Sequence, residues 1–410
     1  MRPRSRPVVA LLGAAVCSLA LAASRPASGQ IGGDPEAMLS RAVILHQTGE
    51  LEGAAAAYEL FLRAVPQATR VRSNLGAVYA ALGRYEEAIE QYRLALTAEV
   101  GGEAELPIRQ NLTLALYKAA RYEEAATEAE ILLAGSTAAR LNRDTVLLLS
   151  DIYLRRGEEE KVVALLTPVA AEDADDKAVA YTLGTALLAQ DEVETAERII
   201  ERVLRDDSPE GHALFATLHM KRGDCEGALA ELEKARAGNP QLRTVNYLSG
   251  VCLMQERSDW AGAAAAFRRE IEVDPNHFES NLFLGNLLRQ EGRHEEALPY
   301  LAHAGRLRGG DVAVEYSLGA AYLALGRDDE AQPLLEQVAV AAPDHMPTHR
   351  WLAVLYTRQG RTEDAAREKA TVVRLAKAAE SQAFQGVSES MSKLLQQSSA
   401  ADAESAEPEP

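Results

Sequence analysis

A regular spacing of small residues constrains this 410-residue chain more than any other feature of its sequence. Ten small residues recur at intervals of 32 to 37 residues, most often 34: Ala54, Ala88, Ala125, Val162, Ala196, Ala228, Ala263, Ala297, Ala331 and Ala365. A fixed period of this length is typical of proteins that stack one structural unit along the chain. The chain is therefore expected to form a repeat array, and not the roughly two or three globular domains that its length would otherwise suggest.

Residues 73–95 show how one unit is expected to fold. Small and apolar residues share one helix face on each side of a glycine, at Leu75, Gly76 and Tyr79 before it and at Ala88, Tyr92 and Ala95 after it. Gly83 lies between the two groups and can adopt the left-handed conformation that ends a helix. Each unit is therefore predicted to be a pair of antiparallel α-helices that pack closely through their small residues.

Two further columns keep the same register along the chain. Only small residues occur at a close-approach position in each first helix: Ala42, Gly76, Thr113, Ser150, Gly184, Ala216, Gly250, Gly285, Gly319 and Ala353. The turn within a unit carries a glycine at Gly49, Gly83, Gly157, Gly223, Gly292, Gly326 and Gly360, and another residue at Ala120, Asp191 and Ser258. These columns predict the turn and the helix contact of every unit.

Helix-pair units with these columns resemble the tetratricopeptide repeat family. The segments GRYEEAIEQYRLAL and YSLGAAYLALGRDDEA are close matches, and the resemblance extends over residues 35–375. It implies an all-α fold, a right-handed superhelical solenoid of antiparallel helix pairs with about ten repeats. It also implies that the first helices line a concave groove, which holds extended peptides or a helix of a partner protein.

The first 22 residues have the pattern of a secretory signal peptide. Three arginines precede an apolar run that ends in Ala20, Leu21 and Ala22, so cleavage is expected near Ala22 and the mature protein is expected in the periplasm or outside the cell. Val16 stands where a small residue normally precedes a lipid-modified cysteine, and no lipid anchor is therefore expected at Cys17. The mature chain is predicted to have no integral membrane segment, because none of its segments has the roughly 20 apolar residues of a membrane span.

The rest of the chain divides into three predicted parts. Residues 23–34 are rich in Pro, Gly and Ser and are expected to form a flexible linker. The repeat array is expected over residues 35–375. Residues 376–410 end in an acidic stretch without apolar side chains, and they are predicted to be a mostly disordered tail.

The chain is strongly acidic. Its formal net charge is −18, and loss of three arginines with the signal peptide would make it −21. This charge argues against nucleic acid and anionic membranes as partners. The mature chain would keep two cysteines, Cys225 and Cys252, in helices of successive units. The sequence leaves open whether they form a disulfide or are two buried thiols.

The sequence shows no catalytic signature. It contains no phosphate-binding loop, dinucleotide-binding glycine pattern or nucleophile elbow, and the repeats occupy nearly all of residues 35–375. We therefore expect no enzymatic activity, no cofactor and no metal site. His345 and His349 are four residues apart and could share a metal, but they flank Pro347 and have no evident third ligand. A metal-dependent protein with a cryptic site is the weakest alternative.

The resemblance places candidate binding residues on the groove face of the first helices. Tyr181, Tyr247 and Tyr316 recur at one column, and Tyr117 and Met254 join them on the same face. Aromatic and flexible apolar side chains suit adaptable contacts with a peptide. Packing between repeats is an equally good explanation of the tyrosines. We expect the main binding stretch between Tyr117 and Tyr316.

Charged and amide side chains complete the predicted groove. Cations lie along one edge of it, at Lys118, Arg155, Lys221, Arg289 and Arg358. They favour an acidic partner segment, although cations near helix C-termini also complement the helix dipole. Asn74 and Asn111 occupy matching places in successive units and could hydrogen-bond the backbone of a bound peptide.

These features predict a non-catalytic protein–protein interaction scaffold. A signal peptide followed by a long repeat array resembles the organisation of bacterial envelope proteins that assist the assembly or export of envelope components. This resemblance is an analogy at the level of architecture. A polysaccharide-binding solenoid is the alternative, but we would expect it to carry more exposed aromatic residues than two tryptophans, Trp260 and Trp351, suggest.

Overall fold

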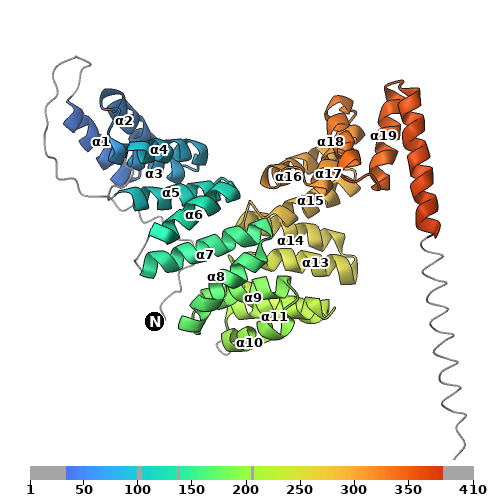
Figure 1. The fold of residues 1–410 in the computed structure, drawn as a ribbon, viewed down its shortest axis with the longest axis horizontal. Helices are drawn as coiled ribbons and strands as arrows, with labels where there is room; N and C mark the ends of the chain where they lie inside the picture. Colours follow the sequence, from blue (N-terminus) through green and yellow to red (C-terminus); the bar gives the residue numbers. More distant parts are fainter. Residues whose placement is uncertain (1–33, 99–103, 136–138, 205–206, 382–410) are drawn as a thin grey trace, which may run out of the picture. The chain divides into compact units, whose positions relative to one another are not determined.

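A computed structural model describes residues 34–98, 104–135, 139–204 and 207–381 (Figure 1). These ranges are helical, with short turns between the helices and no β-strand among them, so the predicted all-α fold is confirmed. The contacts divide the chain into two units, which we call unit 1, residues 1–258, and unit 2, residues 259–410. The predicted signal peptide, most of the predicted linker and residues 382–410 of the predicted tail lie outside the described residues.

Unit 1 is a stack of antiparallel helix pairs. Its helices are α1 (Pro35–Thr48), α2 (Leu51–Ala64), α3 (Thr69–Ala81), α4 (Tyr85–Ala98), α5 (Glu105–Lys118), α6 (Tyr122–Gly135), α7 (Ala139–Arg156), α8 (Glu159–Glu172), α9 (Lys177–Ala189), α10 (Val193–Leu204), α11 (Pro209–Lys221), α12 (Cys225–Gly238) and α13 (Val245–Arg257). Each odd-numbered helix from α1 to α11 is the first helix of a repeat and packs on the even-numbered helix that follows it, as Figure 1 shows for α3 and α4.

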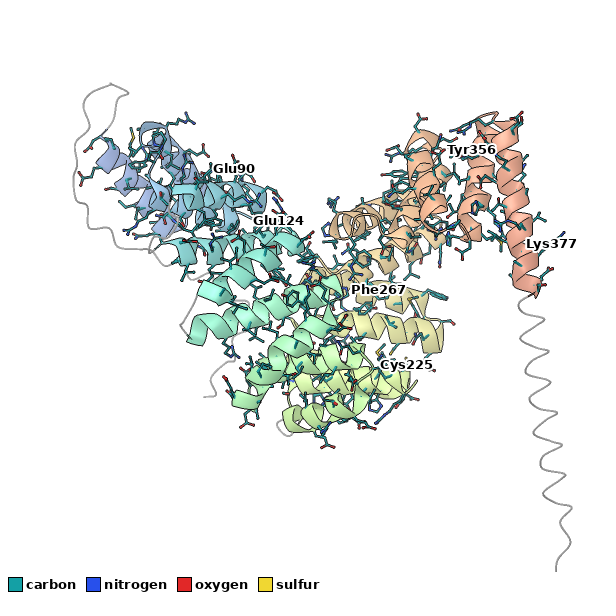
Figure 2. The ribbon with its side chains drawn as sticks, in the orientation of Figure 1. Glu90, Glu124, Cys225, Phe267, Tyr356 and Lys377 are labelled. Carbon is teal, nitrogen blue, oxygen red and sulfur yellow. The ribbon has the colours of Figure 1, made fainter. Side chains whose placement is uncertain are left out.

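Unit 2 continues the same alternation. Its helices are α14 (Trp260–Val273), α15 (Phe278–Gln290), α16 (His294–Leu307), α17 (Val312–Ala324), α18 (Asp328–Ala341), α19 (Met346–Arg358) and a last helix over residues 362–381. The last helix continues past Leu375, where the array was predicted to end, and includes Lys377 (Figure 2). Its final turns contain Ala376, Ala378 and Ala379, which are strong helix formers.

The two packing columns that define the repeat lie in the core. Nine of the ten marker residues, from Ala54 to Ala331, are 0% exposed, and Ala365 is 3% exposed. The close-approach residues of the first helices are buried in all ten repeats as well. The period read from the sequence is therefore the period of close contact between the two helices of each pair.

The turns within the pairs adopt the predicted left-handed conformation. The seven turn glycines have φ angles between 69° and 82°. The three exceptions adopt the same conformation without glycine, with φ of 60° at Ala120, 66° at Asp191 and 47° at Ser258. The geometry of the repeat therefore imposes this backbone conformation, even where the side chain disfavours it.

A recurring polar contact joins successive repeats. A tyrosine of a first helix donates a hydrogen bond to a glutamate of the preceding second helix, from Tyr79 to Glu59 at 2.6 Å and from Tyr356 (Figure 2) to Glu336 at 2.8 Å. Tyr153 of α7 makes the same contact with a glutamate of α6 at 2.7 Å. Because a hydrogen bond to a charged acceptor is stronger than one between neutral groups, these contacts stabilise the stacking of repeats.

First helices also contact one another along each stack. In unit 1 α3 contacts α5, α7 contacts α9, α9 contacts α11, and α11 contacts α13; in unit 2 α15 contacts α17, and α17 contacts α19. The first helices from α7 to α13 in unit 1, and from α15 to α19 in unit 2, therefore form a layer within each unit, and the layer of unit 1 carries the candidate site. None of the described helices is long and apolar enough to span a bilayer.

Candidate functional site

A small apolar hollow lies on the layer of first helices in unit 1. It has a volume of about 160 Å³ and is formed by α9, α11 and the start of α13. Its lining residues are Tyr181, Thr185, Leu188, Ala189, Ala213, Leu214, Thr217, Lys221, Thr244 and Leu248. The structure thus brings together two predicted groove residues, Tyr181 and Lys221. The hollow can accept one apolar side chain of a peptide.

A polar cluster in the same unit surrounds the Asp151 carboxylate of α7. The guanidinium of Arg243, from the loop between α12 and α13, donates to both carboxylate oxygens, from Nη2 to Oδ1 at 2.9 Å and from Nη1 to Oδ2 at 3.1 Å. Arg243 Nη1 also donates to the Tyr117 hydroxyl at 2.7 Å, and that hydroxyl donates to Asp151. Arg155 donates to Asp151 Oδ2 at 3.2 Å and to the Tyr122 hydroxyl at 3.1 Å. We call Tyr117, Asp151, Arg155 and Arg243 the Asp151 cluster.

Burial and charge act in opposite directions on the Asp151 carboxyl. Burial raises its pKa, but the neighbouring charges of Arg243 and Arg155 outweigh burial and hold the pKa well below its usual range. Burial, followed by the Asp151 charge, raises the pKa of the Tyr117 hydroxyl. The cluster at neutral pH therefore contains a carboxylate, two guanidinium groups and a neutral phenol.

The Asp151 cluster and the hollow meet at consecutive residues. Arg243 belongs to the cluster, and Thr244, the next residue, lines the hollow. A chain segment that crosses this part of unit 1 can therefore contact an ion-pairing site and an apolar site through neighbouring side chains.

Family models described as tetratricopeptide repeat match residues 19–69, 69–99, 153–218, 255–311, 288–347 and 346–368, which together make up well over half of the chain. The chain belongs to the tetratricopeptide repeat family. The layer of first helices in each unit is therefore the tetratricopeptide groove face, on which members of the family bind protein partners.

Two proteins with curated descriptions are similar to parts of the chain. Tetratricopeptide repeat protein 21 homolog of Caenorhabditis briggsae is 24% identical over 189 residues, 45% of this chain and 14% of that protein. The Vi polysaccharide export protein VexE of Salmonella typhi is 29% identical over 209 residues, 47% of this chain and 31% of that protein. The matches therefore span less than a third of the length of either relative.

Several solved structures are similar to this chain over different lengths. The APC/C hetero-tetramer Cut9-Hcn1 is matched over 84% of this chain and 88% of the solved chain, with 13% identity and a TM-score of 0.48. PilF of Pseudomonas aeruginosa is matched over 51% of this chain and 96% of its own, with 19% identity and a TM-score of 0.43. MamA of Desulfovibrio magneticus RS-1 is matched over 42% and 96%, with 21% identity and a TM-score of 0.38.

The predicted groove cations of unit 1 already contact groups of the chain itself. The Lys221 ammonium pairs with Asp191 at 2.7 Å. Arg155 pairs with Asp151 at 3.2 Å, and the Lys118 ammonium lies 5.9 Å from the centre of the Tyr117 ring. Such contacts lower the attraction that these cations have for an anionic ligand.

The remaining predicted groove residues of unit 1 occupy less distinctive places. Burial raises the pKa of the Tyr58 hydroxyl in the preceding repeat, and the neighbouring Asn74 side chain opposes this shift. Asn111 lies half-buried on α5, and Tyr247 and Met254 lie half-buried on α13. All four predicted groove residues lie on first helices, but none of them lines the hollow.

In unit 2 an aromatic cluster forms around Tyr316. The guanidinium carbon of Arg289 lies 5.7 Å from the centre of the Tyr316 ring, and His345 packs edge-on against the same ring at 4.8 Å. Trp351 donates an indole hydrogen bond to the Tyr316 hydroxyl at 3.3 Å. Arg358 makes a different contact, since its guanidinium donates a hydrogen bond to the Leu323 carbonyl at 2.9 Å. Two of the three predicted groove residues of unit 2 are thus brought together.

The histidine pair considered as a metal site makes other contacts. Both ring nitrogens of His349 are engaged, Nδ1 with Glu368 at 2.6 Å and Nε2 with the Pro343 carbonyl at 3.1 Å. His345 Nδ1 lies 2.6 Å from the Thr348 hydroxyl. Within the described ranges, no group of three or more His, Cys, Asp or Glu side chains is placed to hold a metal ion.

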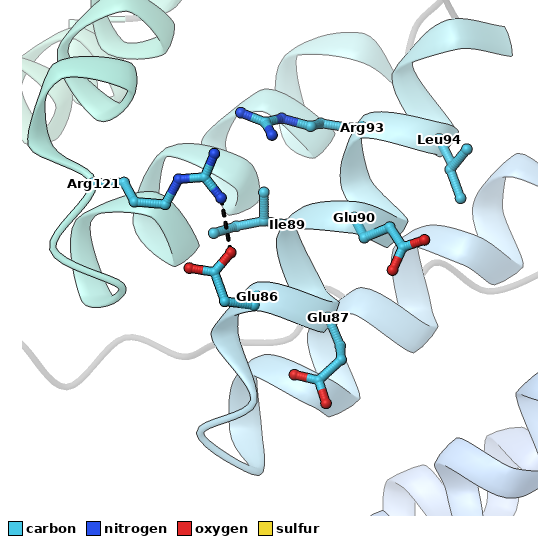
Figure 3. A pocket seen from close by; sticks show the side chains of 7 residues that line it. All are labelled: Glu86, Glu87, Ile89, Glu90, Arg93, Leu94 and Arg121. Carbon is cyan, nitrogen blue, oxygen red and sulfur yellow. Dashed lines mark hydrogen bonds and ion pairs between the residues drawn. The ribbon is translucent and has the colours of Figure 1, made fainter.

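A second hollow lies on the second helix α4, and five of its seven lining residues carry a charge (Figure 3). It has a volume of about 440 Å³ and is lined by Glu86, Glu87, Ile89, Glu90, Arg93, Leu94 and Arg121. Its charged groups pair with one another and with the next repeat: Arg121 bonds Glu86 at 2.7 Å, and Arg93 bonds Glu124 of α6. These pairs link successive second helices. Because Arg121 and Arg93 are already paired with glutamates of the chain, we do not treat this hollow as a candidate binding site.

Asp151 and Arg243 were not among the predicted groove residues. Asp151 directly follows a close-approach residue, where the other repeats carry Val43, Ala77, Leu114, Thr185, Thr217, Val251, Asn286, Ala320 and Val354. A charged residue at a position that is uncharged in the other nine repeats could have marked Asp151 as a candidate site residue. Arg243 gave no comparable signal, because its contacts join residues 126 and 92 positions apart in the chain.

Proposed function

We propose that this protein is a non-catalytic interaction scaffold whose tetratricopeptide groove binds segments of partner proteins. The proposal rests on one observation, the apolar hollow that α9, α11 and α13 form beside the Asp151 cluster. An extended peptide can place one side chain in the hollow and polar groups against the cluster. A helix of a partner can use the same apolar and polar elements.

We further propose that the scaffold acts in the bacterial cell envelope and assists the assembly or export of envelope components. Two observations support this role. Residues 1–22 have the pattern of a secretory signal peptide. In addition, VexE, which is 29% identical over 47% of this chain, is described as a polysaccharide export protein. Cell fractionation and mass spectrometry of the mature N-terminus test the location, because a periplasmic protein should begin near Ala23.

An acidic partner segment could bind the groove cations Lys221 and Arg155 only by displacing carboxylates of the chain itself. An acidic segment would have to compete with Asp191 for Lys221 and with Asp151 for Arg155, and each of these pairs is already within hydrogen-bond distance. Charge reversal of Lys118 and Lys221 to Glu tests the prediction and leaves the Asp151 cluster intact, because neither lysine belongs to it. Loss of partner capture, with the fold retained, would support an acidic partner, and unchanged capture would overturn it.

Site-specific photocrosslinking in the native cell envelope tests the binding function. A photoreactive phenylalanine analogue replaces Tyr181 in the hollow, and in the control chain it replaces Leu94 of α4, on the second-helix side (Figure 3). We expect discrete protein adducts from position 181 and few from position 94. Equal labelling from both positions, or no adducts from position 181, would contradict a partner-binding groove.

A further inference from the structure

Helix α13 begins two residues later than its counterparts. Val312 of α17 lies seven residues before the close-approach residue Gly319, and α9, α11, α15 and α19 begin at the same place in their repeats. In α13 the first helical residue, Val245, lies only five residues before Gly250. Arg243 and Thr244 therefore occupy positions that are helical in the other repeats.

The backbone at this unwound turn is strained. Thr244 has a φ of 76°, a left-handed conformation that a β-branched residue rarely adopts. The corresponding helix α17 begins after Asp311, which has an ordinary φ of −68°. A contact made by this turn must therefore compensate for the strained backbone.

That contact is the one between Arg243 and the Asp151 cluster. The two terminal nitrogens of the Arg243 guanidinium donate hydrogen bonds to the two carboxylate oxygens of Asp151. This bidentate geometry is the one in which a carboxylate binds an arginine side chain most specifically. Arg155 and Tyr117 both bond Oδ2, whereas Arg243 supplies the charged donor to Oδ1. The cluster is thus an arginine-binding site that contains an arginine of the same chain.

We propose that the Asp151 cluster is the recognition site for an arginine of a partner segment, and that Arg243 fills this site until the partner displaces it. The proposal rests on the proposed function and specifies its partner: a basic, extended segment in which an apolar residue neighbours an arginine. The arginine replaces Arg243 at Asp151 and Tyr117, and the apolar side chain enters the hollow next to Thr244.

Charge favours this partner over an acidic one. Replacement of Arg243 by another guanidinium keeps the charge balance of the half-buried cluster and supplies the donor that Asp151 Oδ1 would otherwise lose. A carboxylate in the same place would face Asp151 and would be repelled. The formal net charge of −18 also attracts basic segments from a distance.

Displacement also lets α13 recover its first turn. With Arg243 released, the segment can take the helical start that α17 and its counterparts show, which removes the left-handed conformation at Thr244. Binding is therefore coupled to a local coil-to-helix change. The apparent affinity for a peptide is the intrinsic affinity multiplied by the fraction of molecules in which Arg243 has left the site.

Selection from a phage-displayed library of random dodecapeptides tests the proposal with the full chain, because no ligand needs to be known beforehand. Libraries are panned in parallel against the unmodified chain and against Asp151→Asn, which keeps the shape of the side chain but removes its charge. We expect peptides with arginine next to Leu, Ile or Val from the unmodified chain, and loss of the arginine preference with Asp151→Asn.

An enriched peptide is then synthesised and titrated against Arg243→Ala. Removal of the internal competitor should tighten binding by about tenfold, and a structure of this variant should show α13 beginning near residue 243. Tyr117→Phe should weaken binding severalfold. Arg293→Ala in unit 2, where the arginine pairs with Glu291 and Glu296, is the matched control and should change nothing.

The outcomes separate this proposal from the function on which it rests. Enriched peptides without arginine, or with acidic residues, would overturn the arginine site and leave a peptide-binding groove. No enrichment by any variant would overturn both. Unchanged or weaker binding by Arg243→Ala, with an unchanged start of α13, would show that Arg243 is structural and does not occupy a ligand site.

Discussion

Gly76 of α3 lies directly against the ring of Tyr92 in α4: a Cβ atom on this glycine would stand 2.7 Å from the tyrosine Cε1. Unit 2 repeats the relationship, since a Cβ on Gly285 would stand 2.6 Å from Leu301 Cδ2. Real Cβ contacts are longer than this, so the two helices have approached as closely as a hydrogen atom allows. In these two repeats the glycine is therefore the contact that sets the spacing between the paired helices.

Gly76→Ala should lower the thermal unfolding midpoint. The added methyl group must push aside the buried ring of Tyr92, and overpacking of this kind costs roughly 1–3 kcal/mol. Helix propensity alone would favour alanine by about 1 kcal/mol, so the two effects have opposite signs. Circular dichroism at 222 nm during heating measures the net result.

Gly53→Ala in α2 provides the matched control. This glycine is also helical, but a Cβ there would meet Leu45 at 3.6 Å, an ordinary contact distance. Without overpacking, the substitution should raise the unfolding midpoint. If both substitutions change stability in the same direction, close approach at Gly76 does not limit the packing.

Ala120→Gly should stabilise unit 1 by up to about 1 kcal/mol, because glycine avoids the steric cost of a left-handed conformation for an L-residue. Ala120 has a φ of 60° at the turn between α5 and α6. The reciprocal substitution Gly83→Ala, at a φ of 74° between α3 and α4, should destabilise by a similar amount. Urea unfolding of both variants checks the prediction, and shifts of equal sign would refute the shared turn geometry.

The fold could be predicted because its signals repeat. A small residue in a close-contact column is weak information in one copy, but ten copies in register leave one interpretation, and the marker residues from Ala54 to Ala365 are indeed buried. The left-handed turns were predicted for the same reason. Even Asp191, which is not glycine, follows the geometry of its column.

The candidate site was only partly predictable, because it depends on departures from the repeat. Helical periodicity predicts one common face for Tyr181 and Lys221, and both side chains line the same hollow. The partners of Tyr117 were not foreseen: its hydroxyl bonds Asp151 of the next repeat and Arg243 of a loop far along the chain. Period and spacing carry no information about a contact that occurs once and over such a separation.

Both described thiols should be unreactive in the native chain. Cys225 and Cys252 are free, 3% and 0% exposed, and part of one apolar cluster. Burial, together with the neighbouring Cys225, raises the pKa of the Cys252 thiol well above its usual range. Iodoacetamide at pH 8 should therefore label neither thiol until guanidinium chloride unfolds the chain.

Mass spectrometry of the labelled Cys17→Ser variant counts the modified thiols. A pair that stays unlabelled in denaturant but reacts after reduction would show a disulfide instead.

The Tyr79–Glu59 contact should make the stability of the first repeats depend on alkaline pH. Burial, followed by the hydrogen bond to Glu59, raises the pKa of Tyr79 from 10.0 to about 12. The folded state thus holds this proton more tightly than the unfolded state, so the stabilisation is complete below pH 10 and is lost as the pH rises towards 12.

Tyr79→Phe should therefore cost about 1.5–3 kcal/mol at pH 8, the range for a hydrogen bond to a charged group. The difference in unfolding midpoint between the unmodified chain and Tyr79→Phe should shrink between pH 10 and pH 12, because deprotonation removes the same hydrogen bond from the unmodified chain. Glu59→Gln keeps an acceptor without the charge and should lose only part of the stability. A difference that stays constant over this pH range would mean that the tyrosine stabilises the repeats through its ring alone.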